Sequence, residues 1–485
     1  MKRGICLLLV LLLLAVGGAG YAGAALNAQK DAVAVGVTDL YGDRAAAEGL
    51  SVKTRAQLDR RLHWDTAYAA GDPAAARTDF RYTPEQEVED GEHSYDGVTL
   101  RLHVNFSSGT SGSFDLSEAN RMDPTLESMI LLFRDVAGRT DAGETHTETV
   151  ALADYYETFP LSVAVALPGF RFDPFLSHVS GDDSHDPETE ITAALRNYFQ
   201  VPVPADFKLE ISIQKDAGGG ITDIGCHETE AYSVSFSSQS VYTDDTCYFV
   251  FNAVNEKDGQ PLDMSRVPGG AGVYRLPYTA QEGLDTDRLE LFYSLSPSTD
   301  VWELRISPQR DRLLLLTMAD AGWQLTGLDA ETGALRQRLK LLDLLPPAGP
   351  DDERRVYQFT LTGDLLVLYL SSGQFCLAER AADGRYQLQF ACLVDLPDQS
   401  KLVATISSGD AAPVWDGERL ALAKFDYTAS QFDSYHALCG VTVAVLDASG
   451  VRYLGEYGNS LDATWNRAGP NCAAAGCAPL TLAWG

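Results

Sequence analysis

The sequence predicts an all-β fold, and three hairpins in its second half carry this prediction. Each hairpin consists of two runs rich in apolar and β-branched residues, joined by a short turn that contains glycine. The hairpins span residues 324–342, 376–393 and 441–457 and turn at Gly333, Gly384 and Gly450. The turn glycines lie 51 and 66 residues apart. Repeats of this length that contain only strands are typical of β-propeller blades.

The first hairpin also carries a recognisable turn string, Leu328-Asp329-Ala330-Glu331-Thr332-Gly333. This string resembles the strand–turn signature of the quinoprotein-like (PQQ-repeat) and WD40-like propeller superfamilies, and residues 447–450 keep part of it. The tryptophan that usually follows in quinoprotein repeats is missing, because residues 336–339 stand in its place. The resemblance covers the last third of the chain. It implies a propeller fold and carries no quinone-binding residues across.

We therefore interpret residues 51–485 as one β-propeller of about seven blades, with six or eight also compatible. Seven blades would have about 62 residues each, which is long for four strands and their loops. The rival interpretation is two stacked β domains that divide near residues 284–299. Residues 27–50 are rich in alanine, glycine and aspartate and are expected to be a spacer, with a short helix at 44–48.

Strand-like segments recur along the whole predicted domain. An early segment, 51–58 or 62–68, is expected to complete the last blade by pairing with the strand at 479–484. Further strands are expected at 99–107, 128–135, 147–154, 161–167, 207–213, 232–237, 248–254, 301–306, 312–317, 356–361, 365–369, 402–406 and 419–425. One inserted helix is expected at 187–199, where apolar residues recur at helical spacing after Asp186 as N-cap and Pro187 as first helical residue.

Residues 1–26 carry a targeting signal. Lys2 and Arg3 precede an uncharged run that extends to residue 26, which is long enough to cross a bilayer core of about 30 Å. Ala22-Gly23-Ala24 also offers a signal-peptidase site, so the segment is either a retained signal anchor, which we favour, or a cleaved signal peptide. In both cases the positive-inside rule places the domain on the extracytoplasmic side.

The charge balance restricts the partners of the domain. The chain has 68 acidic and 37 basic residues, for a formal net charge of −31. Such a charge argues against binding nucleic acid, and against contact with anionic lipid other than through the N-terminal segment. It indicates either a need for solubility or a specific cationic partner, and solubility is the simpler explanation.

The number and positions of the cysteines are consistent with export, because disulfides form in extracytoplasmic compartments. Seven of the eight lie after the apolar segment, so at most three disulfides can form and one thiol remains. The candidate pairs are Cys226–Cys247, Cys376–Cys392 and Cys472–Cys477. Cys376 and Cys392 flank Gly384 on one hairpin, and they can bridge only if the hairpin places both on the same face.

The sequence contains no motif with catalytic spacing, so no catalytic residue and no cofactor site is assigned. Asp182, Asp183 and Asp186 form the densest acidic loop and are a candidate Ca²⁺ site, with helix capping and plain solvation as the simpler explanation. Cys226 and His227 could suggest a nucleophile–base pair, but neighbours on a strand face opposite ways.

Two function classes remain. The first is a non-enzymatic, membrane-tethered binding or scaffold module that uses propeller loops to bind a protein or glycan. The second is an extracellular hydrolase or lyase, acting on carbohydrate or peptide, with carboxylates lining the propeller channel. The aromatic residues Trp64, Tyr155, Tyr156, Trp302 and Trp465 suit either a binding face or a packed core.

Overall fold

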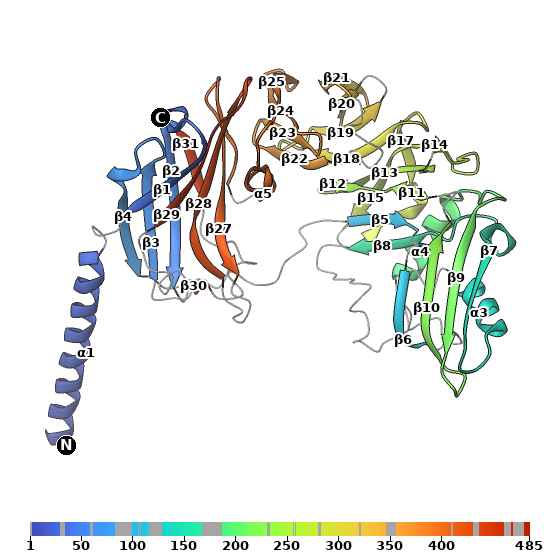
Figure 1. Cartoon of the computed structure of the whole chain (residues 1–485), viewed down its shortest axis with the longest axis horizontal. Coiled ribbons are helices and arrows are strands. Elements are labelled where there is room, and N and C mark those ends of the chain that lie inside the picture. Colours follow the sequence, from blue (N-terminus) through green and yellow to red (C-terminus); the bar gives the residue numbers. More distant parts are fainter. Residues whose placement is uncertain are drawn as a thin grey trace. The chain divides into compact units, whose positions relative to one another are not determined.

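The structure is a computed structural model, and most of its regular elements are strands (Figure 1). It describes residues 2–29, 34–58, 62–82, 99–104, 106, 108–114, 116, 129–166, 187–229, 233–255, 257, 259–279, 283–319, 322–345, 356–408, 411–429, 436–459, 467–468 and 480–485. The chain divides into two compact units. The first unit comprises Met1–His93 and Leu345–Gly485, and the second comprises Ser94–Leu344.

The first unit contains three antiparallel sheets. One four-stranded sheet has the order β31 (Thr481–Trp484), β2 (Leu50–Leu58), β3 (Leu62–Ala69), β4 (Arg77–Tyr82). A second has the order β22 (Val356–Thr362), β23 (Leu365–Leu370), β24 (Gln374–Arg380), β25 (Tyr386–Leu393). The third has the order β1 (Val35–Gly42), β29 (Gly450–Asn459), β28 (His436–Asp447), β27 (Leu420–Ala429), β26 (Val414–Trp415), and β30 (Arg467–Ala468) pairs with β28.

The second unit contains two further four-stranded sheets, a seven-stranded sheet and a two-stranded sheet. The four-stranded sheets are β6 (Ser108–Phe114), β10 (Ile221–Glu228), β9 (Lys208–Lys215), β7 (Thr145–Ala151), and β18 (Asp300–Ile306), β19 (Arg312–Ala319), β20 (Gly322–Asp329), β21 (Leu335–Leu342). The seven-stranded sheet has the order β11 (Val234–Ser237), β13 (Thr246–Asn255), β15 (Gly272–Thr279), β16 (Gly283–Leu284). Three further strands pair with it, β12 (Ser240–Tyr242) and β14 (Gln260–Pro261) with β13, and β17 (Glu290–Ser294) with β15. The two-stranded sheet consists of β5 (Thr99–His103) and β8 (Ser162–Ala166).

The four-stranded sheets β18–β21 and β22–β25 follow chain order, which is the meander of a propeller blade. The all-β, propeller-type fold predicted from the sequence is thus confirmed in its repeating sheets, while the number of blades stays a prediction. The predicted pairing of an early strand with the last one is also confirmed. β31 joins β2 with Leu50 opposite Trp484 and Val52 opposite Leu482.

All three turn glycines occupy the conformation that the hairpins require. Their φ angles are +70° at Gly333, +80° at Gly384 and +111° at Gly450, where a side chain is penalised. Asp329 organises the first turn, because its carboxylate accepts hydrogen bonds from the backbone N–H groups of Glu331 and Thr332 at 3.2 and 3.0 Å.

Several sequence predictions require correction. The expected spacer is largely part of the fold: β1 pairs with β29, and the expected helix at 44–48 is the 3₁₀ turn η2 (Arg44–Ala47). The expected helix at 187–199 is α4 (Pro187–Tyr198), but it does not stand alone. Two expected strands are helices, α3 (Ile130–Arg139) and α5 (Ser400–Ser407). The structure also contains three other short 3₁₀ turns, η3 (Pro73–Ala75), η5 (Leu152–Asp154) and η7 (Thr286–Arg288).

Each unit has its own apolar core. In the first unit the sheet of β31 and β2 packs with the sheet of β27–β29 around Tyr68, Tyr453 and Tyr457. The Tyr457 hydroxyl donates to the backbone oxygen of Ala70 at 2.8 Å and lies 3.0 Å from the Tyr453 hydroxyl. Tyr453 in turn donates to Asp39 at 2.9 Å, which ties β1 into the core. The second unit is built around a large cluster of phenylalanines and aliphatic residues.

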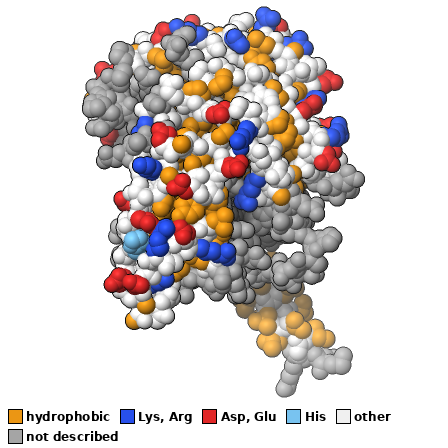
Figure 2. All heavy atoms as spheres, turned by 90° about the vertical axis from the view of Figure 1, so that its right-hand side faces the viewer, with side chains coloured by type: hydrophobic (Ala, Val, Ile, Leu, Met, Phe, Trp, Pro, Cys, Tyr) orange, Lys and Arg blue, Asp and Glu red, His pale blue; other side chains and the backbone are white. Residues whose placement is uncertain are grey.

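The N-terminal helix α1 (Lys2–Gln29) contains a 22-residue segment, Gly4–Ala25, that is long and apolar enough to cross a membrane. Its side chains are exposed, as a signal anchor or signal peptide requires. The face of the molecule drawn in Figure 2 carries acidic and basic side chains interspersed with apolar ones.

Candidate functional site

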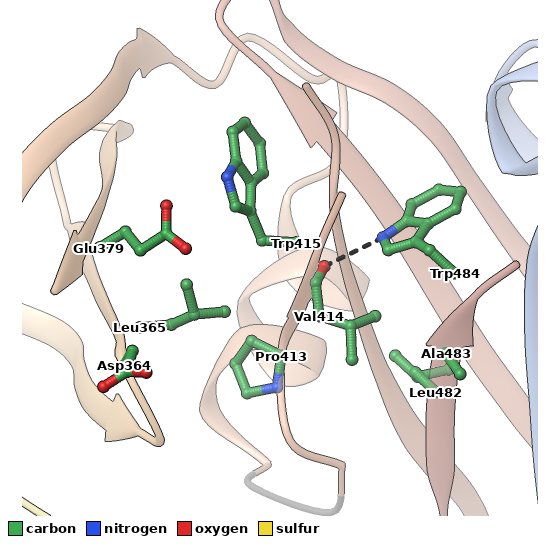
Figure 3. A pocket seen from close by; sticks show the side chains of 9 residues that line it. All are labelled: Asp364, Leu365, Glu379, Pro413, Val414, Trp415, Leu482, Ala483 and Trp484. Carbon is green, nitrogen blue, oxygen red and sulfur yellow. Dashed lines mark hydrogen bonds between the residues drawn. The ribbon is translucent and has the colours of Figure 1, made fainter. Parts of the chain in front are cut away.

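A pocket of about 410 Å³ lies on the surface of the first unit, where three of its sheets meet (Figure 3). The sheet β22–β25 supplies one wall, β26 supplies the next, and β31 supplies the third. The lining residues are Asp364, Leu365, Glu379, Pro413, Val414, Trp415, Leu482, Ala483 and Trp484. The volume falls in the range of about 300–1,000 Å³ that is usual for small-ligand sites.

The acidic wall is positioned by the register of one hairpin. Glu379 on β24 lies directly opposite Leu365 on β23, so both side chains project from the same face of the sheet. Asp364 precedes Leu365, and its backbone oxygen accepts a hydrogen bond from Arg380 at 2.8 Å. In Figure 3 the carboxylate of Glu379 points toward Trp415 across the pocket. Two carboxylates therefore stand at one side of an otherwise apolar opening.

Two half-buried indoles form the opposite side. The Trp484 Nε1–H donates to the backbone oxygen of Val414 at 3.2 Å, which fastens β31 to β26. The Trp415 ring packs against Phe390, with the ring centroids 5.6 Å apart. Both indoles belong to short strands of the sheet framework, so their positions are fixed before any ligand arrives.

Arg419 holds Trp484 from behind the lining. Its guanidinium lies 4.1 Å from the centre of the Trp484 ring and pairs with Asp416 at 2.9 Å. The same group donates to the backbone oxygens of Ala46 and Glu48 at 2.9 and 3.1 Å. Burial raises the pKa of Asp416, but hydrogen bonds from the backbone and side chain of Arg419 outweigh this, so its pKa lies below the usual range. Arg419 is thus neutralised locally.

The nine lining residues include two acids and no lysine, arginine or histidine. The pocket therefore has a net negative character, and the charge of Arg419 is already compensated by Asp416. The aromatic and aliphatic lining supplies apolar contact, while the carboxylates accept hydrogen bonds. Chemically this arrangement suits a ligand with an apolar body and a donor or cationic end.

The predicted Ca²⁺ ligands Asp182, Asp183 and Asp186 lie outside the described residues. Among the residues that the structure describes, no group of three or more histidines, cysteines and acids could hold a metal ion. A carboxylate with a pKa raised by burial is Glu303 in the second unit, and its partner Arg305 lies 3.1 Å away. Glu303 is therefore ion-paired within β18.

Two predicted disulfides are not formed in this structure, in which Cys226, Cys247, Cys376 and Cys392 are free thiols. Cys376 lies opposite Ala391 in the hairpin, so Cys392 projects from the other face of the sheet. Cys226 and Cys247 lie in the same core cluster but on strands of different sheets. Burial raises the pKa of both thiols to about 12, so they are packed, unreactive cysteines. Cys472 and Cys477 lie outside the described residues.

The other residues considered in the sequence have structural partners where they are described. Tyr155 donates to Asp135 on α3, and Trp302 packs against Trp323 with centroids 5.3 Å apart. Cys226 is buried whereas its neighbour His227 on β10 is exposed, so the two side chains project from opposite faces of the sheet, and the Glu228 carboxylate accepts a hydrogen bond from the backbone N–H of Val234 at 2.9 Å. The side chain of Trp64 and residue Trp465 lie outside the described part of the chain, and Tyr156 packs against the core cluster.

None of the residues that form the pocket had been assigned a functional role from the sequence. The pocket is formed by three segments that are far apart in the sequence, at 364–379, 413–415 and 482–484. They meet because β31 pairs with β2 and because β26 is the edge strand of the sheet that also contains β27. The one local signal is a tryptophan in a two-residue strand, directly before the turn at Asp416 and Gly417.

Comparison with known proteins yields weak structural similarity. No protein-family model and no curated protein matches the sequence. The β-propeller domain of Cps50 (Swd1) from Myceliophteria thermophila aligns at 11% identity, over 52% of this chain and 69% of that chain, with a TM-score of 0.24. A gluconolactonase of Xanthomonas campestris aligns at 15% identity over 52% and 68%, with a TM-score of 0.22. Hsv2 of Kluyvelomyces marxianus aligns at 9% over 47% and 77%, with a TM-score of 0.20.

Proposed function

We propose that the protein is an exported, membrane-tethered binding module whose recognition site is the pocket of Asp364, Glu379, Trp415 and Trp484. The observation that carries the proposal is the lining itself. Two half-buried indoles and two carboxylates converge on one opening, and strands of the sheet framework position them. Such a site is rigid and needs little reorganisation to bind a ligand.

The tether is α1, which precedes β1 by only a few residues. Lys2 and Arg3 at the start of the apolar segment place the N-terminus in the cytoplasm by the positive-inside rule, so the domain lies on the extracytoplasmic side. A ligand of the pocket is then an extracytoplasmic molecule or the exposed part of an envelope component.

The second candidate function is hydrolysis of carbohydrate or peptide, and the paired carboxylates favour it. Asp364 and Glu379 line the same opening, and a hydrolase needs two such groups, one as acid and one as base or nucleophile, on either side of the scissile bond. An acid catalyst usually sits in a dry environment that keeps it protonated, whereas Asp364 is exposed and Glu379 is half-exposed. Binding without turnover is therefore the better-supported function.

The test is affinity purification with the full-length protein, solubilised from its own envelope, comparing the unmodified protein with Trp415→Leu. Leucine keeps the contact with Phe390 apolar while it removes the indole from the pocket. The matched control is Asp395→Asn, an exposed acid outside the pocket lining. We expect a ligand that the unmodified protein and Asp395→Asn retain and that Trp415→Leu loses.

Retention by all three proteins would place binding elsewhere and refute the proposal. Chemical conversion of the retained molecule, abolished by Glu379→Gln, would replace the binding function by the hydrolase.

A further inference from the structure

We propose that the pocket binds an alkylammonium group, of the kind carried by a lysine side chain. This inference rests on the proposed function and names its ligand. Such a group has a four-carbon apolar stem and a compact cationic head with three hydrogen-bond donors. The two halves of the pocket match the two halves of that group.

The acidic wall suits the cationic head. Asp364 and Glu379 can accept hydrogen bonds from an ammonium, and no basic side chain belongs to the nine lining residues. The Arg419 guanidinium, which lies 4.1 Å from the centre of the Trp484 ring, is paired with Asp416 at 2.9 Å and so repels an incoming cation only weakly. The net charge of −31 adds a long-range attraction for cations.

The opposite wall suits the stem. Pro413, Val414 and Leu482 offer aliphatic contact, and the indole of Trp415 faces the Glu379 carboxylate in Figure 3. An ammonium held between that indole and that carboxylate gains a cation–π contact and an ion pair at once. The chain itself uses the same chemistry nearby, where the Arg419 guanidinium lies over Trp484 and pairs with Asp416.

The test uses the full-length protein in detergent micelles and titrates it with defined probes by ligand-observed NMR. The probes are the peptide acetyl-Gly-Lys-Gly-amide, the same peptide with an acetylated lysine, and butylammonium. Acetylation keeps the stem and removes the charge, so it isolates the contribution of the ammonium. We expect the lysine peptide to bind at least about fivefold more tightly than its acetylated counterpart.

Three variants locate the binding. Glu379→Gln and Asp364→Asn each keep the size of the side chain and remove one charge, and each should weaken the lysine peptide about three- to tenfold. The matched control Asp395→Asn should leave the affinity unchanged. Raising the salt from about 0.05 to about 0.5 M should weaken binding to the unmodified protein.

The outcomes separate this inference from the proposed function. Equal affinity for the lysine and acetyl-lysine peptides, or no binding of either while Trp415→Leu still loses its envelope ligand, would overturn the alkylammonium ligand and leave the binding function standing. If no envelope ligand depends on Trp415 for its retention, both proposals are refuted. Binding of butylammonium as tightly as the peptide would identify a free amine as sufficient, and preference for the peptide would identify a protein lysine; both results support the inference.

Discussion

Replacement of Gly333 by alanine should destabilise the second unit by about 2–4 kcal/mol, through two separable effects. Its φ of +70° lies in the left-handed region, which costs a residue with a β-carbon about 1–2 kcal/mol. A β-carbon at this position would also lie 2.7 Å from the backbone oxygen of Phe292, which cannot move without disturbing β17. Relief of that overlap should cost about 1–2 kcal/mol more.

The matched control is Gly270→Ala in the same unit. Gly270 has a φ of +74°, and its β-carbon would meet nothing within 4 Å, so it should lose only the first amount. Ala334→Val, one residue after Gly333, should cost little. Urea unfolding followed by tryptophan fluorescence, because Trp323 is buried in the neighbouring strand β20, measures all three midpoints. Equal losses at Gly333 and Gly270 would refute the steric argument, and a neutral Gly333→Ala would refute the turn assignment.

Three further predictions concern charge, packing and topology. The Arg336 guanidinium and the Thr332 hydroxyl hold the pKa of Asp329 well below its usual range. The ionised Asp329 carboxylate therefore stabilises the folded state above about pH 4, and this stabilisation disappears as the pH falls further. The thermal unfolding temperature of Asp329→Asn should consequently depend less on pH between about 5 and 2 than that of Glu331→Gln. Tyr457→Phe leaves the oxygen of Ala70 without its donor and should cost about 1–2 kcal/mol, measured by the urea midpoint of the first unit. A protease added to intact cells should remove the domain and leave the anchor, and protection of the domain would reverse the predicted orientation.

The hairpin turns were predictable because their determinants are local. An aspartate that caps its own turn and a glycine at positive φ act within four residues, so Asp329 and Gly333 are recognisable from sequence alone. The pairing of β31 with β2 is not local, and its prediction rests on the architecture: a closed propeller joins an early strand to its last blade, and a strand-like segment lies near each end of this domain.

The two misassigned helices were ambiguous for a physical reason. In α5, Leu402, Thr405 and Ile406 are buried at helical spacing, yet Leu402, Ala404 and Ile406 also alternate as in a strand. A short apolar run fits both periods, and tertiary packing decides between them. A signal before α5 was available: Asp398 accepts from the backbone N–H of Ser400 at 2.9 Å, at the start of the helix.

The pocket could not be predicted because its walls come from segments that meet only through sheet closure. Leu482 lies opposite Val52 in the sheet formed with β2, and Trp484 reaches β26 through its hydrogen bond to Val414. No periodicity in one sequence encodes such a meeting. The predicted Cys376–Cys392 disulfide failed for a similar reason, since the register of β24 and β25 decides on which face Cys392 lies.

The stretch expected to be a spacer has a direct part in the site. The backbone oxygens of Ala46 and Glu48, just before β2, bind the Arg419 guanidinium, and that guanidinium covers one face of Trp484. The low pKa of Asp416 keeps this carboxylate ionised, so Arg419 stays paired and the indole stays in place across the physiological pH range. The same pairing compensates the guanidinium charge next to Trp484, and the nine residues that line the pocket include no basic side chain. The segment between β1 and β2 thus stabilises the aromatic wall of the pocket, because it holds Arg419 against Trp484.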